Sequence, residues 1–140
     1  MLFRSRDIAP VNPGQTAGRI VPDVAANASA NTGYFVVAGG QQEISGGTSA
    51  SAPLWAALVA RMNQQLAASG KRVGYLTPLL YGASQGGSAP LGKAGCNDIH
   101  SGDNITAHVG GFKSSTSFDA VTGWGSPKGK DLLAALTKLL

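Results

Sequence analysis

The sequence contains one cysteine, Cys96, so no disulfide bond can form within the chain. Charged residues make up only 13% of the 140 residues, and just seven of them are acidic. Lys and Arg are scattered without interleaved aromatic residues, which argues against a nucleic-acid partner. No stretch approaches the roughly 20 apolar residues that a membrane span requires. The first residues also lack the apolar core of a secretory signal.

Hydrophobic residues nevertheless account for 43% of the chain, which is typical of a globular protein. Apolar patterns predict strands over 34–38, a buried one, and 41–45, joined by a turn at Gly39-Gly40. A further strand-like run starts at Arg19, after an irregular segment over 1–18. No internal repeat or linker divides the chain, so we expect one α/β domain or part of a larger one.

Helical spacing is strongest over 51–69, which Gly70 is expected to terminate. The apolar face predicted for this helix consists of Leu54, Trp55, Leu58, Val59, Met62 and Leu66. Shorter helices are predicted over 77–81, with Thr77 as the N-cap, and over 130–140. Residues 82–97 read as a loop, and residues 98–127 show little periodicity. Because so long a structureless segment is unusual in a compact domain, a metal ion is an expected means of holding it.

The run from Ser45 to Pro53, S-G-G-T-S-A-S-A-P, precedes this longest helical pattern. A serine between small residues at the start of a helix is one way in which hydrolases present a nucleophile. The glycines admit a substrate backbone, and the helix dipole favours a developing oxyanion. The alternative is a Gly/Ser turn in which Ser51 caps the helix and Pro53 lies in its first turn. Local spacing leaves both interpretations open.

Four blocks of the sequence, taken together and in order, resemble the sedolisin family of serine-carboxyl peptidases, especially its kumamolisin-like members. The blocks are R-I-V-P-D-V-A over 19–25 with T-G-Y over 32–34, G-G-T-S-A-S-A-P-L-W-A-A-L over 46–58, N-D-I over 97–99 with Gly102 and Asn104, and F-D over 118–119 with T-G-W-G-S-P over 122–127. The resemblance implies a subtilisin-like α/β fold, present here in part. It also implies cleavage of a polypeptide substrate by acyl transfer, in a secreted enzyme, with Ser49 as the nucleophile.

The same resemblance implies a calcium site in the segment over 98–127. Carried over residue by residue, Asp98 and Asp119 supply carboxylates, and Ile99 supplies a main-chain carbonyl. Ser115 and Ser117 stand where the family usually has glycines that bind through their carbonyls. Hard oxygen ligands of this kind suit Ca²⁺.

The family's general base is a Glu that an Asp orients, and a protonated Asp stabilises its oxyanion, which suits acidic conditions. Here the only glutamate is Glu43, and no Glu-x-x-x-Asp segment precedes Ser49. The acids are Asp7, Asp23, Glu43, Asp98, Asp103, Asp119 and Asp131. We therefore expect residues 1–140 to be the C-terminal part of a peptidase domain that needs the missing N-terminal part. Alone, the chain is expected to be inactive.

A different class of function remains open, namely a non-catalytic, calcium-stabilised module that packs against a partner chain. A histidine-dependent triad is disfavoured, because His100 and His108 both follow the serine. Of the remaining residues, Asp23 reads as structural, and Cys96 and Trp55 read as packing residues. Asp103 and Asn104 are either calcium partners or turn residues. The sequence leaves substrate preference undefined.

Overall fold

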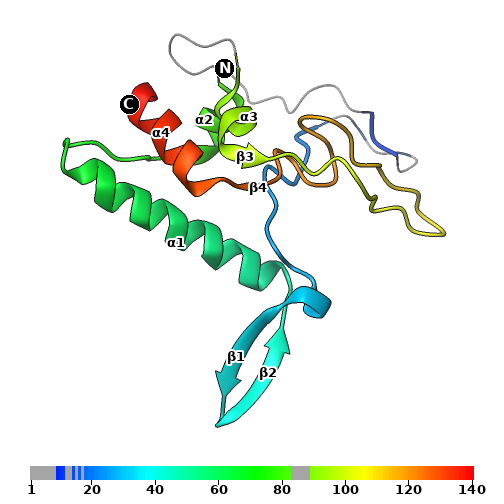
Figure 1. Cartoon of the computed structure of the whole chain (residues 1–140). Helices are drawn as coiled ribbons and strands as arrows, with labels where there is room; N and C mark the ends of the chain where they lie inside the picture. Colours follow the sequence, from blue (N-terminus) through cyan, green and yellow to red (C-terminus); the bar gives the residue numbers. More distant parts are fainter. Residues whose placement is uncertain (1–8, 12–13, 15, 17, 83–88) are drawn as a thin grey trace. The chain divides into compact units, whose positions relative to one another are not determined.

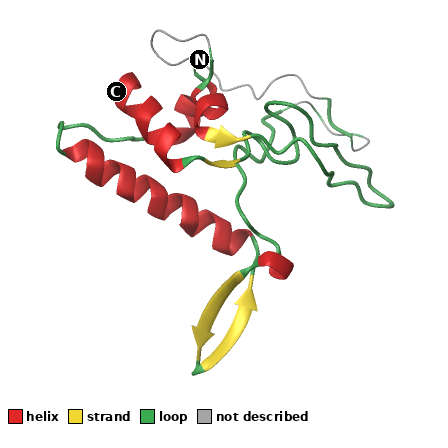
Figure 2. Ribbon diagram, in the orientation of Figure 1, coloured by secondary structure: helices red, strands yellow, loops and turns green. Residues whose placement is uncertain are grey.

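The computed structural model describes residues 9–11, 14, 16, 18–82 and 89–140. It contains helices and short strands, as an α/β fragment should, and the strands form two antiparallel pairs (Figures 1 and 2). The described residues divide into two compact units. Residues up to Ala25 and Gly74–Leu140 make up the first unit, and Ala26–Val73 make up the second. The assignment of the whole chain to a single peptidase domain stays a prediction.

The second unit contains a β-hairpin followed by the longest helix. After the short 3-10 helix η1 (Ala30–Thr32), strand β1 (Tyr34–Ala38) pairs with β2 (Gln41–Ser45). Gly39 and Gly40 have φ values of 58° and 78°. These left-handed values suit a two-residue hairpin turn, so both predicted strands and their turn are confirmed.

The prediction that the strand over 34–38 is buried is wrong. Phe35 is 82% exposed and Val37 is 71% exposed. On β2, Ile44 is 53% exposed. The physical reason is that an apolar run is buried only where another layer packs on the face of its sheet, and no other part of the second unit does so here.

Helix α1 (Thr48–Ala67) begins three residues before the predicted start at Ser51. Its buried side chains are those of Trp55, Met62 and Leu66, in agreement with the predicted face and with the packing role of Trp55. Leu54 was assigned to that face but is 36% exposed. Gly70 follows the helix with a φ of 67°, and its amide donates to the carbonyl of Ala67, as a helix stop should.

The first unit contains three helices and a second strand pair. They are α2 (Leu76–Tyr81), α3 (Leu91–Gly95), β3 (Cys96–Asn97), β4 (Ser126–Pro127) and α4 (Gly129–Leu139). Helix α3 packs against both α2 and α4. Leu80, Leu91, Leu132 and Leu136 form the centre of the buried core. The closing helix was thus predicted to within one residue.

Two other predictions for this unit require correction. Helix α2 has Tyr75 as its N-cap without a side-chain hydrogen bond, so Thr77 lies inside the helix rather than capping it. The predicted loop over 82–97 contains α3 and β3, while residues 83–88 of it lie outside the described part. The glycines of α3 make close packing possible. A Cβ on Gly92 would lie 2.3 Å from Cγ of Trp124, and one on Gly95 would lie 2.5 Å from Cδ1 of Leu132.

The strand-like run that starts at Arg19 does not form a strand. It contains a cis Val21-Pro22 bond, and proline has no amide to donate to a ladder. Two backbone hydrogen bonds fix it instead. The amide of Ala25 donates to the carbonyl of Gly125 over 3.0 Å, and that of Trp124 donates to the carbonyl of Asp23 over 2.9 Å.

Candidate functional site

A rigid glycine junction connects the hairpin to α1. The amide of Gly47 donates to the carbonyl of Ala28 over 2.6 Å, and Gly47 has a φ of 106° that other residues rarely adopt. A Cβ on Gly46 would lie 2.7 Å from the amide nitrogen of Ala30. Both glycines are therefore needed for the backbone to pass this point.

Gly47 is the N-cap of α1, which places Ser49 in the first turn of the helix. The Ser49 side chain is exposed. The first turn contains no acidic residue, so the positive end of the helix dipole is not neutralised there. Pro53 lies four residues after Ser49 inside the helix, and it cannot donate the usual helical hydrogen bond to the Ser49 carbonyl.

Ser51 does not cap the helix, contrary to the alternative interpretation of this motif. Its hydroxyl donates to the carbonyl of Asn27 over 3.0 Å, and its amide donates to the carbonyl of Gly47 over 3.4 Å. The hydroxyl of Tyr34 also donates to the carbonyl of Asn27, over 3.1 Å. Ser51 thus ties the start of α1 to the segment before the hairpin, whereas Ser49 faces outward.

Charged groups are scarce around this serine. The unit that contains Ser49 spans Ala26–Val73, and its sequence includes one acid, Glu43, and no histidine. Glu43 lies on β2 and is exposed. Asp7 lies outside the described residues, and all the other acids belong to the first unit. Residues 26–73 alone therefore offer no carboxylate pair for a base.

The five residues predicted to bind calcium lie in one cluster of loops in the first unit. The amide of Ser117 donates to Oδ2 of Asp98 over 2.8 Å, and the amide of Ser115 donates to Oδ2 of Asp119 over 2.9 Å. The hydroxyl of Thr122 links the cluster to Ile99 by donating to its carbonyl over 3.4 Å. The two carboxylates thus hold the segment 115–117 between them.

Asp119 is the central residue of this cluster. Its side chain is 3% exposed, and it is the only buried charged residue in the described part of the chain. Its Oδ1 accepts hydrogen bonds from the amides of Val121 and Thr122, both over 2.8 Å, and from the Thr122 hydroxyl over 3.2 Å. Buried carboxylates are stable only when their oxygens are satisfied in this way or by a cation.

The donor chemistry of the cluster fits Ca²⁺, since it offers two carboxylates and several main-chain carbonyls. Ser117 has a φ of 72° and is the one non-glycine residue with a positive φ among the described residues. A positive φ favours glycine, which is the residue that the family resemblance implies at this position. The described residues contain no group of three or more His, Cys, Asp or Glu side chains placed to hold a metal.

Asp103 acts as a turn residue, whereas Asn104 joins two segments of the loop region; a role of either as a calcium partner stays a prediction. Oδ1 of Asp103 accepts from the amide of Ile105 over 3.0 Å. Oδ1 of Asn104 accepts from the amide of Phe112 over 2.7 Å. The Asp103 bond is typical of an Asx turn, and the Asn104 bond pairs this segment with Phe112 eight residues further on.

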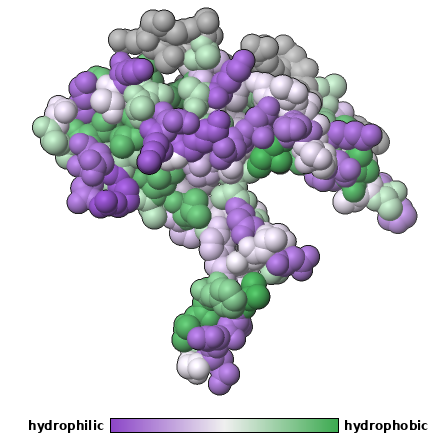
Figure 3. Space-filling view, viewed as in Figure 1, coloured by the Kyte–Doolittle hydropathy of each residue, from purple (hydrophilic) through white to green (hydrophobic). Residues whose placement is uncertain are grey.

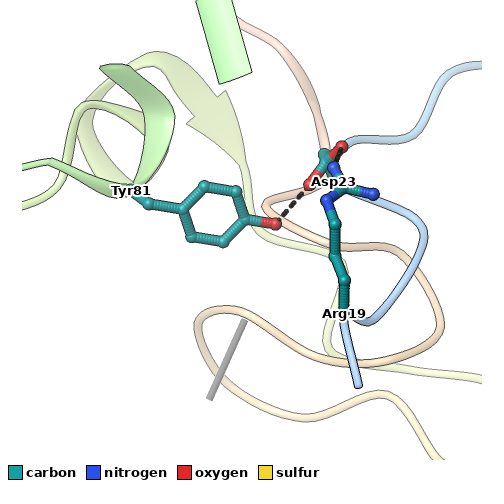
Figure 4. Close-up of polar contacts among 3 residues, drawn as sticks. All are labelled: Arg19, Asp23 and Tyr81. Atoms are coloured by element: carbon teal, nitrogen blue, oxygen red, sulfur yellow. Dashed lines mark hydrogen bonds and ion pairs between the residues drawn. The ribbon is translucent and has the colours of Figure 1, made fainter. Parts of the chain in front are cut away.

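Asp23 joins three parts of the first unit, in agreement with its predicted structural role (Figure 4). Oδ1 of Asp23 accepts from the Tyr81 hydroxyl over 2.6 Å, and Oδ2 pairs with the Arg19 guanidinium. The pair raises the pKa of Arg19. Tyr81 also packs edge-on against Phe118 and Trp124, with ring centroids 5.5 and 5.8 Å away. No local sequence signal identifies Tyr81 as the partner, because it is 58 residues from Asp23.

Tyr81→Phe is expected to flatten the loss of stability at alkaline pH. Burial, and then the hydrogen bond to Asp23, raise the pKa of Tyr81. The folded state therefore favours the neutral phenol, and its stabilising effect is lost as pH rises above about 10, where the unfolded tyrosine ionises. At neutral pH the variant should lose about 1 kcal/mol because the hydrogen bond is gone.

Urea midpoints measured between neutral and alkaline pH test this prediction. Tyr75→Phe is the matched control, because Tyr75 is 70% exposed. Equal pH profiles for the wild type and Tyr81→Phe would contradict the role given to this phenol.

Cys96 is a buried packing residue, as predicted, and is 3% exposed. Burial raises the pKa of its thiol to about 11, and nearby Lys128 opposes this change. A thiol in this state is a poor nucleophile, so the single cysteine adds no chemistry to the candidate site.

Comparison with known proteins bears on all of these motifs. The chain is 48% identical over 126 residues to kumamolisin from Bacillus sp. (strain MN-32), which covers 89% of the chain and 21% of that protein. The chain is therefore homologous to proteins of the sedolisin family. It is also 38% identical over 117 residues to the tripeptidyl-peptidase sed1 of Aspergillus fumigatus, covering 83% of the chain and 16% of that protein.

Tripeptidyl-peptidase 1 of Canis lupus familiaris is 33% identical over 139 residues, or 98% of the chain and 24% of the relative. No family model matches the chain. Two of these sedolisin relatives are tripeptidyl-peptidases by name, and the chain spans about a fifth of the length of the three relatives. None of the described helices is long and apolar enough to cross a membrane.

Proposed function

We propose that this chain is the nucleophile-bearing, C-terminal part of a secreted sedolisin-type endopeptidase with a subtilisin-like fold. Ser49 is the nucleophile, and the substrate is a polypeptide cleaved by acyl transfer at acidic pH. One observation carries the proposal. Ser49 is exposed in the first turn of α1, two residues after Gly47 with its φ of 106°, in a chain 48% identical to kumamolisin.

The chemistry requires groups that the Ser49 unit does not contain. Attack by the serine Oγ on a peptide carbonyl needs a base to accept the hydroxyl proton, and it needs donors for the oxyanion. Glu43 is the only acid in that unit and lies on the hairpin, so neither a carboxylate pair nor an oxyanion acid is available within it. The base, its orienting acid and the oxyanion acid are supplied by the rest of the peptidase.

Joining the chain to the missing part is expected to create an activity that the chain lacks by itself. The isolated chain should not cleave a denatured protein at about pH 4, where a carboxylate base works. Co-expression with the part of kumamolisin outside the match should produce cleavage, measured by release of soluble peptides. Ser49-dependent cleavage by the isolated chain would contradict the proposal that the base and the oxyanion acid lie outside it. A stable but inactive pair would favour a non-catalytic module.

We further propose that the loop cluster of the first unit binds Ca²⁺. Asp98 and Asp119 supply carboxylate oxygens, and Ile99, Ser115 and Ser117 supply main-chain carbonyls. The support is their mutual proximity through hydrogen bonds of 2.8 to 3.4 Å and the left-handed backbone of Ser117. An ion there would neutralise two carboxylates and hold together a segment without helices or strands between Asn97 and Ser126.

Removal of calcium is expected to destabilise the chain. An ion that binds only the folded state adds about 2.7 kcal/mol at a free concentration a hundred times its dissociation constant. EDTA should therefore lower the melting temperature, and added Ca²⁺ should restore it, as followed by circular dichroism.

Asp98→Ala should abolish this response, because it removes one of the two carboxylates. Asp103→Ala is the control, since its carboxylate accepts from the amide of Ile105 within a local turn. A melting temperature of the wild type that is unchanged by chelation would exclude the calcium site.

A further inference from the structure

The hairpin exposes an apolar face that no other residue of its own unit, Ala26–Val73, covers. Phe35 and Ile44 are direct cross-strand partners, and Val37 lies on the same side of β1 as Phe35. They are 82%, 53% and 71% exposed, respectively. Figure 3 shows hydrophobic surface on this hairpin. We call Phe35, Val37 and Ile44 the hairpin face.

The backbone of the hairpin is also incompletely paired. Strands β1 and β2 bond only to each other in the described part of the chain, so each has an outer edge with no strand beside it. A two-stranded hairpin is marginally stable by itself, and open edges beside exposed apolar side chains are sites of association. The hairpin thus has both features of a surface that pairs with another polypeptide segment.

The position of the hairpin links it to the candidate nucleophile. Strand β2 ends at Ser45, and Ser49 follows four residues later in the first turn of α1. The intervening Gly46 is held tightly, since a Cβ there would lie within 2.7 to 2.8 Å of the backbone at 28–30. A segment bound on the hairpin would therefore be held at a fixed position relative to Ser49.

We propose that the hairpin face docks the part of the peptidase that this chain does not contain, and that docking brings the partner's groups to Ser49. This inference rests on the proposed function. The match covers 89% of this chain but 21% of kumamolisin, so most of the relative's length is available as the occupant. The hairpin face carries no charge, which suits an apolar segment.

A second copy of the chain suits this surface less well. Each copy has a net charge of +4, so two copies repel each other. A second copy would also bring the same serine unit with its single acid, Glu43, and no base pair. The missing part of the peptidase is therefore the occupant that both covers the face and completes the site.

The test is a binding titration with chemically matched variants. The probe is the part of kumamolisin outside the match, expressed as a separate polypeptide, and binding is followed by fluorescence anisotropy. Val37→Thr/Ile44→Thr should weaken binding at least about tenfold, because it removes apolar contact and keeps strand-forming residues. Ile105→Thr/Val109→Thr removes the same groups at sites 47% and 57% exposed, and should change binding by less than about twofold.

Binding and cleavage separate this inference from the proposed function. Binding that depends on the hairpin face, without cleavage that depends on Ser49, would support docking and contradict the enzymatic proposal. Equal losses in the two double variants would overturn docking. Self-association of the chain that Val37→Thr/Ile44→Thr abolishes, with no affinity for the probe, would overturn it in favour of a second copy.

A fusion protein tests the same proposal if the probe does not fold as a separate polypeptide. The probe is fused ahead of this chain, and hydroxyl-radical labelling of Phe35 is compared with that in the isolated chain. Docking predicts at least about fivefold less labelling in the fusion, because a ring that is 82% exposed becomes covered. Unchanged labelling of Phe35 in a folded fusion would overturn the proposal.

Discussion

In the assembled peptidase, Ser49→Ala is expected to lower kcat by about 10³-fold or more while leaving KM nearly unchanged. The hydroxyl is the group that would form the acyl-enzyme, and alanine keeps the start of α1 intact. Ser49 is exposed and in the first turn of the helix, so its removal should cost little stability. The measurement is steady-state cleavage of a fluorogenic peptide at acidic pH.

Ser51→Ala is the matched control for this prediction. Ser51 lies two residues further on, and its hydroxyl donates to the carbonyl of Asn27 over 3.0 Å. Its loss should cost about 1 kcal/mol of stability and change kcat by less than about threefold. If Ser49→Ala retained activity and Ser51→Ala lost it, the nucleophile would be Ser51.

Local sequence patterns were sufficient to predict the hairpin, α1 and α4. The apolar run over 34–38 and the two glycines that follow it predicted the hairpin, and helical spacing predicted α4. The length and burial of α1 were also close to expectation. In each case the information lies within a few residues along the chain, so no distant contact is needed to infer it.

Predictions failed where a distant residue decides the structure. Glycines disfavour helices, yet Gly92 and Gly95 lie in α3 because the lack of a Cβ lets Trp124 and Leu132 pack there. The burial of β1 depends on what packs against it, and the apolar run over 34–38 carries no information about that. The partnership of Asp23 with Tyr81 is likewise invisible in the sequence.

For the candidate site too, local sequence patterns were informative only in part. Local spacing at G-T-S-A left two interpretations open, and the family resemblance assigned the role of nucleophile to Ser49, which stays a proposal. The calcium residues came from the family resemblance. The structure brings Asp98, Ser117 and Asp119 into one cluster but leaves the ion itself a proposal.

Gly125→Ala is expected to unfold the first unit or to destabilise it by about 3 kcal/mol or more. A Cβ at this position would lie 1.8 Å from the carbonyl oxygen of Asn97 and 2.9 Å from its carbonyl carbon. These are backbone atoms next to the β3–β4 pair, and Gly125 also accepts the hydrogen bond from the amide of Ala25. No side chain can therefore move aside to relieve the contact.

Gly102→Ala separates this clash from the conformational cost of a left-handed residue. Gly102 has a φ of 110°, and a Cβ there would meet nothing within 4 Å, whereas Gly125 has a φ of 93°. Gly102→Ala should therefore lose only about 1–2 kcal/mol, the cost of positive φ for an L-residue. Urea midpoints at constant m-value give the difference between the two variants. Equal losses would mean that the backbone at 97–98 can shift, and that Gly125 is needed for its φ alone.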